Sequence, residues 1–401
     1  MTAIANLPDL RPSLLLDFAN SGRVDPRIQC TRASAATCFG PDGKLRTVAA
    51  NVPRIDYDPA TGKCLGLLVE EQRTNLVSRS NELSHADWVK SGLVDIGAPD
   101  ANLMTKLVAT TENRTHSLYS ATTSIGFADD TLLTISVEAK AGGMNFFWLR
   151  CVNKAGGFAS ATFNLLTGAA SLRGATSANM KSLGGGVYRC SATFNLGAGA
   201  SGAAGRTLLA LATGEGAGAE VFAGDGVAGV WFRNVQTEGG AFPTSYIPAE
   251  ASASTKAGDL PSVTLTQESG CILIRYLPRV SPSAGQNYFL SALNSGATRM
   301  FGAFYNASGV VRAAEINVGS LRQGVNSLAM SYGGGSVTSV SNGGSSFTST
   351  YVVAPPSALH VGTSNTSPSG PSAFGPINGH IQSILVYPSQ LPALQMQRLT
   401  A

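Results

Sequence analysis

The sequence is poor in charge. Asp, Glu, Lys and Arg make up 13% of its 401 residues, about half of the roughly 25% that is usual in globular proteins. The 28 basic and 24 acidic residues leave a net charge of +4, and no basic block occurs. A nucleic-acid partner requires clustered cations that face the phosphates. We therefore expect no nucleic-acid partner.

Long apolar runs are also missing. Apolar runs such as residues 14–16 and 66–69 are far shorter than the roughly 18 residues of a membrane-spanning helix, so no membrane insertion is expected. Residues 1–11 have no cationic start followed by an apolar core, so no secretory signal is visible. These absences favour synthesis in the cytoplasm.

Motifs that carry catalysis are absent from the sequence. It contains no zinc-protease helix motif, phosphate-binding loop, dinucleotide-binding glycine fingerprint or nucleophile elbow. Its four histidines lie far apart, and none has a metal-ligand spacing; His85 or His380 as a general base is the disfavoured alternative. We expect no enzyme activity, no catalytic residue, no cofactor and no metal site.

Acidic residues that stand close together in the sequence are expected to be solvated turn groups, because nothing in the sequence pairs two of them across a cleft as glycoside hydrolysis requires. These carboxylates are Glu70 with Glu71, Asp56 with Asp58, and Asp129 with Asp130.

The six cysteines are spread along the chain without a CxxC pair. We expect reduced, mostly buried thiols, and a bridge between Cys30 and Cys38 stays an open alternative.

Glycine is what the sequence has in abundance. Its 46 glycines, with many Ser, Thr and Ala, suit short strands joined by tight turns, because glycine adopts the positive φ angles that turns require. Segments of alternating polarity predict strands. The clearest are residues 132–140, 145–152, 159–165, 187–194, 227–233, 271–276, 288–292 and 380–387. The composition and the alternation together predict an all-β protein.

Changes in composition and in the pattern of alternation along the chain predict three regions. Residues 1–75 form a small β-rich attachment or organising region with a hairpin of residues 54–57 and 65–69. Residues 76–258 form a jelly roll that ends in a linker over residues 248–259. Residues 259–401 form a second β-sandwich with a short helical tail at residues 392–400, and the Gly-rich residues 332–346 are expected to be loops or edge hairpins.

Tryptophans are candidates for sugar binding, because the CH face of a sugar stacks on an indole. Alternation puts Trp148 with Phe146 and Arg150 on one face of a strand, opposite Phe147 and Leu149. The charge of Arg150 favours the outward face for Trp148. The alternative is that Trp148 and Trp231 are core residues, as large aromatic residues usually are.

Two strings resemble a segment of phage tail-fibre, spike and other virion-surface proteins. These strings are residues 51–59 and residues 66–76, with Trp88 following. Residues 161–168, 186–190, 222–226 and above all 235–248 resemble the carbohydrate-binding-module-like jelly roll of such proteins. Residues 379–394 resemble, more loosely, the end of a concanavalin-like or laminin-G-like domain.

The resemblance implies a virion structural protein that sits on the particle surface after assembly in the host bacterial cytoplasm. Its implied partners are other virion proteins, copies of itself (a trimer is our prediction) and a host cell-surface polysaccharide. Within the matching strings we take Tyr188 and Arg189 as ligand-binding residues beside Trp148 and Arg150. The familiar form has Trp where this chain has Val187, which removes one stacking aromatic.

Two other functions stay open. One is a baseplate or capsid-decoration subunit without a ligand, and the other is a glycan depolymerase. The depolymerase is disfavoured because tail spikes that cleave glycans are typically long β-helices, and the sequence has no solenoid period.

Overall fold

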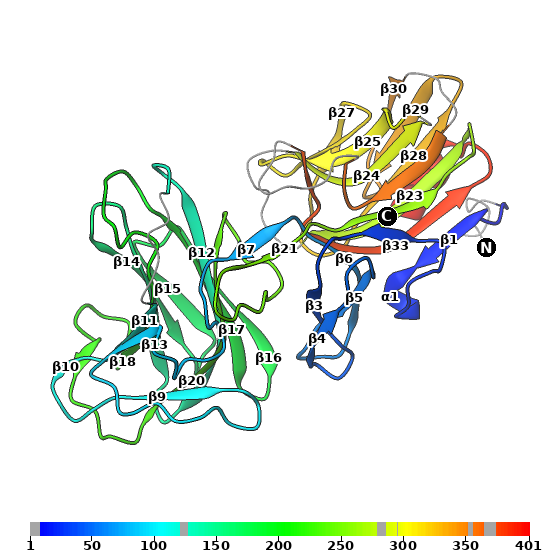
Figure 1. The fold of residues 1–401 in the computed structure, drawn as a ribbon. Helices are drawn as coiled ribbons and strands as arrows, with labels where there is room; N and C mark the ends of the chain where they lie inside the picture. The colour runs from blue at the N-terminus through cyan, green and yellow to red at the C-terminus, as the bar shows by residue number, and fades with distance from the viewer. Residues whose placement is uncertain (1–8, 121–126, 279–285, 295, 352–355, 365–373) are drawn as a thin grey trace. The chain divides into compact units, whose positions relative to one another are not determined.

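Strands dominate the structure. The computed structural model describes residues 9–120, 127–278, 286–294, 296–351, 356–364 and 374–401. In these ranges the helices are α1 (Phe18–Ser21) and α2 (Ala393–Thr400), and the other regular elements are strands (Figure 1). The all-β prediction is therefore confirmed, as is the helical tail.

The chain divides into two compact units. Unit 1 contains the described residues of Met1–Asp58, Gly62–Gln72 and Ala257–Ala401, and unit 2 contains Pro59–Thr61 and Arg73–Lys256. This differs from the predicted three regions, because almost all of the N-terminal region belongs to the same unit as the C-terminal one.

Unit 1 is a sandwich of two eight-stranded sheets. The first has the order β30 (Ser346–Thr350), β29 (Ser336–Ser341), β28 (Asn326–Gly333), β23 (Gly270–Pro278), β33 (Gly379–Tyr387), β6 (Cys64–Val69), β5 (Arg54–Tyr57), with β1 (Leu14–Asp17) also on β33. The second has the order β2 (Gln29–Thr31), β22 (Leu260–Thr264), β31 (Pro356–Val361), β24 (Gln286–Asn294), β25 (Arg299–Tyr305), β26 (Val310–Ala313), β27 (Ile316–Ser320), with β32 (Phe374–Pro376) on β24. Residues of both sheets, among them Ile272 and Phe289, share one buried core.

The N-terminal strands complete the sheets of unit 1. The predicted hairpin forms as β5 and β6, and β6 pairs with β33, where Leu68 lies opposite His380. β1 also pairs with β33, and β2 pairs with β22. These pairings satisfy backbone N–H and C=O groups that would otherwise be exposed at strand edges. The N-terminal region therefore forms part of unit 1 and is not a separate domain. A small hairpin of β3 (Ala36–Phe39) and β4 (Leu45–Val48) adjoins it.

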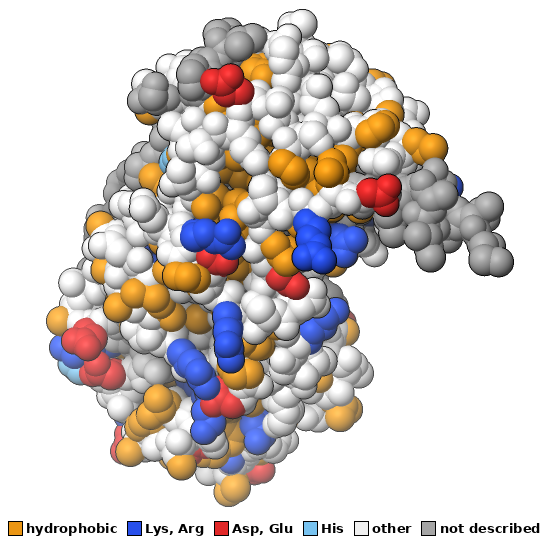
Figure 2. All heavy atoms as spheres, turned by 90° about the vertical axis from the view of Figure 1, so that its right-hand side faces the viewer, with side chains coloured by type: hydrophobic (Ala, Val, Ile, Leu, Met, Phe, Trp, Pro, Cys, Tyr) orange, Lys and Arg blue, Asp and Glu red, His pale blue; other side chains and the backbone are white. Residues whose placement is uncertain are grey.

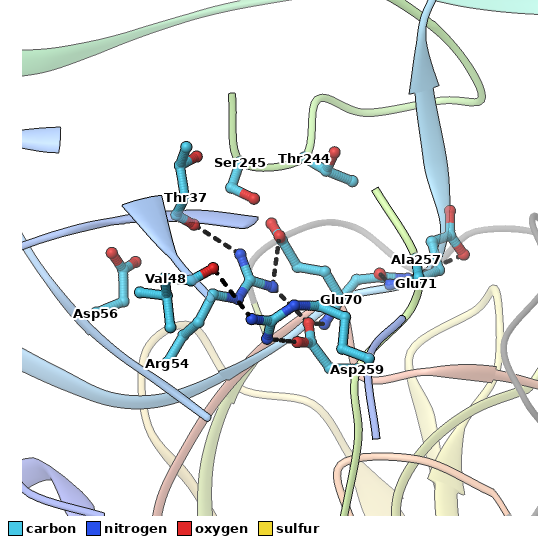
Figure 3. Close-up of polar contacts among 12 residues, drawn as sticks. Thr37, Val48, Arg54, Asp56, Glu70, Glu71, Thr244, Ser245, Ala257 and Asp259 are labelled. Atoms are coloured by element: carbon cyan, nitrogen blue, oxygen red, sulfur yellow. Dashed lines mark hydrogen bonds and ion pairs between the residues drawn. The ribbon is translucent and has the colours of Figure 1, made fainter. Parts of the chain in front are cut away.

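A buried ion-pair network joins the N-terminal segments to the chain that re-enters unit 1. Arg32 and Arg54 both contact Asp259, with 2.9 Å between Arg32 Nη1 and Asp259 Oδ1. Arg54 Nη2 also lies 3.1 Å from Glu70 Oε2, and Arg54 Nη1 donates to the carbonyl of Thr37 (Figure 3). Burial lowers the pKa of Arg54, but the carboxylates of Asp259 and Glu70 outweigh it and raise that pKa, so the guanidinium stays charged.

The prediction of solvated turn carboxylates is wrong at three positions. Glu70, Glu71 and Asp56 are 1%, 2% and 4% exposed, because each is hydrogen-bonded inside unit 1. Asp56 accepts from the backbone of Phe39 and lies 2.9 Å from His380 Nε2. The prediction holds for Asp129, which is exposed.

The predicted linker is ordered structure. β21 (Ser254–Lys256) pairs with β7 (Arg73–Asn75), and Asp259 is 2% exposed. The small Ser and Ala residues of this stretch are typical of a linker, which is why the composition alone predicts one here.

Unit 2 is a sandwich of a six-stranded and a five-stranded sheet. The six-stranded sheet has the order β15 (Ala169–Arg173), β14 (Phe158–Asn164), β13 (Phe146–Val152), β18 (Thr207–Ala212), β11 (Ser117–Ser120), β8 (Trp88–Ser91). The five-stranded sheet has the order β16 (Ser177–Gly184), β17 (Val187–Asn195), β12 (Leu132–Gly142), β20 (Gly229–Gly239), β9 (Thr105–Val108). A ribbon of β10 (Arg114–Thr115) and β19 (Val221–Phe222) adjoins them. The core between the sheets includes Phe147, Phe163 and Phe232.

Several other predictions can be compared with the fold. The Gly-rich residues 332–346 form an edge hairpin, since they include β29 next to the edge strand β30. The part of the chain that the structure describes has no helix long and apolar enough to cross a membrane. On the face shown in Figure 2, Lys and Arg side chains lie mainly in the middle and lower part, with hydrophobic side chains among them.

All six thiols are free in the structure, so Cys30 and Cys38 are not bridged. Cys30 lies in β2 and Cys38 lies in β3, and the two strands pair with different partners. Burial raises the pKa of Cys38 to about 11 and those of Cys151 and Cys271 to about 12.

Asp259→Asn is expected to lower the free energy of unfolding by about 3–5 kcal/mol, because two buried guanidiniums lose a shared carboxylate. Urea unfolding followed by circular dichroism measures the loss. The matched control is Asp42→Asn, which removes an exposed pair with Arg46 and should cause no measurable change. Equal stability of the two variants would contradict a structural role for the network.

Thiol titration checks the absence of a bridge. In denaturant at pH 8, Ellman's reagent is expected to find six thiols per chain without prior reduction. In the native protein the buried thiols should react far more slowly, since their raised pKa values leave little thiolate at that pH. A count of four in denaturant would show a disulfide.

Candidate functional site

Two of the four predicted ligand residues lie on the outer face of the six-stranded sheet. Phe147 and Leu149 of β13 point into the core of unit 2. Trp148 and Arg150 alternate with them and lie on the opposite face, where Trp148 packs with Ala210 outside the main core. Trp148 therefore lies on the outer face of the sheet, as the sequence predicts.

Neighbouring strands bring further side chains to this face. The guanidinium carbon of Arg150 lies 4.5 Å from the ring centre of Phe158 and 5.6 Å from that of Trp148. The guanidinium carbon of Arg173 lies 4.6 Å from the Trp148 ring centre. Such distances are typical of cation–π contacts. We call Trp148, Arg150, Phe158 and Arg173 the Trp148 cluster.

The Trp148 ring itself is covered. It is 1% exposed, and its Nε1 donates to the carbonyl of Gly214, 3.2 Å away, in the loop of residues 213–220. Phe158 is 53% exposed. The ring that this cluster presents to solvent is therefore Phe158, while Trp148 supports the two arginines.

The loop of residues 213–220 adds carboxylates to the cluster. Ser171 Oγ donates to Glu215 Oε2 at 2.7 Å, and Arg173 donates to the Glu215 carbonyl at 2.9 Å. Burial lowers the pKa of Arg150; the Glu220 carboxylate opposes this shift, and the charge of Arg173 adds to it. Two arginines and two glutamates leave the site close to electrical balance.

Three buried polar atoms near this face have no hydrogen-bond partner among the described residues. They are Arg150 Nε, Thr162 Oγ1 and Glu220 Oε2, and Thr162 lies directly opposite Trp148 in the sheet. An unsatisfied buried polar group costs about 1–3 kcal/mol. The site therefore holds donors and acceptors that the hydroxyl groups of a ligand, or ordered water, would satisfy.

Tyr188 and Arg189 do not join the cluster. Both lie in β17 of the five-stranded sheet, where Tyr188 packs against the core. Arg189 lies on the outer face and donates to the carbonyl of Thr244 and to Ser136 Oγ. Adjacent positions in a strand point to opposite faces, so these two residues do not form one binding surface.

Sequence reasoning missed Phe158, Arg173 and the glutamates of the loop. Alternation along β14 puts Phe158 on the outer face, but only the register of Val152 with Phe158 brings it beside Arg150. Nothing local to residues 213–220 indicates that this loop folds over Trp148.

The other two tryptophans differ in exposure. Trp88 is 4% exposed, and its Nε1 donates to the carbonyl of Arg79. Trp231 is half-buried on the outer face of the five-stranded sheet, with Lys106 Nζ 5.9 Å from its ring centre. Lys106 and Lys140 lie directly opposite it in the two neighbouring strands, and it belongs to the other sheet from the Trp148 cluster.

Other places in the described part of the chain offer less chemistry. No three His, Cys, Asp or Glu side chains among the described residues converge as a metal-binding group. A cavity of about 440 Å³ in unit 1 is lined by Ser13, Arg27, Gln29 and Gln267 among others. No aromatic ring lines it, and its one charged lining residue, Arg27, pairs with Asp25 at 2.7 Å.

No family model and no curated protein matches this chain. Among solved structures, the carbohydrate-binding module CBM40 of the Ruminococcus gnavus IT-sialidase, bound to alpha2,3 sialyllactose, is 17% identical over 34% of this chain and 84% of that one, with a TM-score of 0.28. A heptameric SAP-like pentraxin from Limulus polyphemus is 14% identical over 33% of this chain and 70% of that one, with a TM-score of 0.25.

The Trypanosoma rangeli sialidase is also similar, at 10% identity and a TM-score of 0.29. The match covers 77% of this chain and 62% of the sialidase. The expectation that this chain is not an enzyme is therefore withdrawn, since enzymes stand among the similar structures. Likeness at this level assigns no activity to the chain.

Acrylamide quenching of tryptophan fluorescence checks the burial of Trp148. Trp231 is expected to be the main quenched residue, because Trp88 and Trp148 are covered. Trp231→Phe should therefore remove most of the quenchable signal, and Trp148→Phe should leave it. The reverse result would show that Trp148 is open to solvent.

Proposed function

We propose that this protein is a structural subunit on the surface of a phage or phage-like particle, and that its unit 2 binds a host cell-surface polysaccharide. The observation that carries the binding is the Trp148 cluster. Two arginines and an exposed phenylalanine lie together on the outer face of a sheet, beside polar atoms that have no partner in the described part of the chain.

The chemistry of the cluster suits a sugar. The exposed ring of Phe158 offers an apolar surface to the CH groups of a pyranose. Arg150 donates hydrogen bonds and Glu220 accepts them, which fits hydroxyl groups that do both. The rigid sheet and the stacked guanidiniums fix these groups before a ligand arrives, which reduces the entropy lost on binding.

The strings that resemble virion-surface proteins have a physical role in this fold. In residues 235–248, Glu238 accepts hydrogen bonds from the backbone and hydroxyl of Thr244. The carbonyl of Thr244 in turn accepts from Arg189, so this segment contacts the outer face of the five-stranded sheet at Arg189. In residues 66–76, Glu70 belongs to the buried network. Both strings stabilise the scaffold. This supports the proposal that the chain shares the folded modules of virion-surface proteins.

A particle-surface role agrees with a modest site in unit 2 of each chain. Several copies in a fibre or spike raise avidity without any new contact. A homo-oligomer, with a trimer as the predicted state, remains part of the proposal, and so do contacts with other virion proteins.

Arg150→Ala and Phe158→Ala are expected to weaken adsorption of the purified protein to host cells or to arrayed polysaccharide. The expected loss is about tenfold or more for Arg150→Ala, since a hydrogen bond from a charged group is worth about 1.5–3 kcal/mol. Leu172→Ala is the matched control, because Leu172 is 55% exposed on the same sheet and lies outside the cluster. Circular dichroism confirms the fold of each variant.

Binding that is unchanged in both cluster variants would exclude this site. No binding by the unaltered protein at high micromolar concentration would favour the subunit without a ligand. Incubation with the same polysaccharide and a reducing-end assay measures cleavage directly.

A further inference from the structure

The second sheet of unit 1 carries a related arrangement on its outer face. Phe289, Ala303 and Val311 of strands β24, β25 and β26 point into the core. The residues that lie opposite one another on the outer face are Tyr288, Phe304 and Arg312. The ring centres of Tyr288 and Phe304 are 4.9 Å apart.

Two guanidiniums cover these rings. The guanidinium carbon of Arg299 lies 4.8 Å from the ring centre of Tyr288, and that of Arg312 lies 5.5 Å from that of Phe304. Gly302 makes this possible, because a Cβ there would lie 3.0 Å from the Tyr288 ring and 3.2 Å from Arg299 Cδ. The rings fix the positions of the arginines.

This face differs from the Trp148 cluster in what it presents to solvent. Tyr288 and Phe304 are 0% and 1% exposed, so no ring is available for stacking. The side chains of Arg299 and Arg312 are 30% and 32% exposed. A ligand of this face would therefore meet guanidinium N–H groups.

The charges on this face do not balance. Glu315 is the acidic partner of both arginines, at 4.0 Å from Arg299 and 3.9 Å from Arg312, and its side chain is 63% exposed. These long, exposed contacts hold the carboxylate weakly, while Arg312 Nη2 also donates to the backbone carbonyl of Glu315. Two cations and one anion leave an excess positive charge.

Unpartnered donors lie on the same face. Arg312 Nε and Ser291 Oγ are buried without a hydrogen-bond partner among the residues that the structure describes. Ser291 is 0% exposed and lies directly opposite Gly302 and His360 in the sheet. Within the same described ranges His360 Nδ1 is also buried and unpartnered, although the imidazole ring of His360 has a backbone hydrogen bond with Ser364.

We infer that this face of unit 1 is a second ligand site, and that it binds the carboxylate of an acidic sugar. A planar carboxylate receives two parallel hydrogen bonds from a guanidinium, and positioned arginines with excess positive charge fit that group. The site is independent of the Trp148 cluster, so either one can fail without the other.

Isothermal titration with trigalacturonate, an oligosaccharide of three acidic sugars, tests the inference. Binding is expected for the unaltered chain, and the methyl-esterified trisaccharide, which lacks the charge, should bind at least about tenfold more weakly. Inorganic phosphate and acetate serve as free-anion probes, and both should bind more weakly than trigalacturonate.

Variants locate the binding. Arg299→Ala combined with Arg312→Ala should lower the affinity about tenfold or more, and Arg46→Ala is the surface-arginine control. Glu315→Gln should raise the affinity about two- to fivefold, because it frees both guanidiniums from a weak exposed pair. This variant keeps the test valid if the double variant does not fold.

Tryptophan fluorescence separates the two sites. Trp88, Trp148 and Trp231 all belong to unit 2, so trigalacturonate bound to unit 1 should leave the emission unchanged. The inference is overturned if the esterified trisaccharide binds equally well, if phosphate binds as tightly as trigalacturonate, or if Glu315→Gln does not bind more tightly. Binding that shifts the emission and is lost in Arg150→Ala would assign the acidic sugar to the Trp148 cluster instead.

Discussion

The shared contact of Arg32 and Arg54 with Asp259 is the constraint on which unit 1 depends. Guanidiniums without access to water need carboxylates within reach, because an uncompensated buried charge costs several kcal/mol. Asp259 is separated in sequence from both arginines by all of unit 2. The network therefore selects the one arrangement in which the N-terminal hairpin and the returning chain lie together, and the pairing of β6 with β33 is consistent with it.

Although the chain has few charged residues, four of its arginines lie over aromatic rings on the outer faces of sheets. In unit 2, Arg150 and Arg173 lie over aromatic rings on the outer face of a sheet, and in unit 1 Arg299 and Arg312 do the same. An aromatic ring beneath a guanidinium restricts its rotamers and lowers the entropy lost on binding. The two faces differ in one respect that matters for ligands: the first presents a ring and balanced charge, whereas the second presents guanidiniums with excess positive charge.

Local pattern predicted much of the fold but only part of the site. Alternation identified β12, β13, β17 and β33, and it put Trp148 on the outer face of its strand. It did not predict that Trp148 is covered, since the loop that contains Gly214 is 66 residues away in sequence. Tyr188 and Arg189 are predicted ligand residues because residues 186–190 resemble part of a binding module, yet the pleat of β17 sends the two side chains to opposite faces.

The sequence by itself determined the all-β class, the faces of the long strands and the free state of most thiols, because each follows from composition or from a period of two residues. Tertiary structure decided which strands are neighbours, that Glu70, Glu71 and Asp56 are buried, and which arginines lie over which rings. The reason is physical: side-chain alternation is set by the backbone of one strand, whereas burial and ion pairing depend on partners from other strands, which for Asp259 and His380 lie 205 and 324 residues along the chain from Arg54 and Asp56.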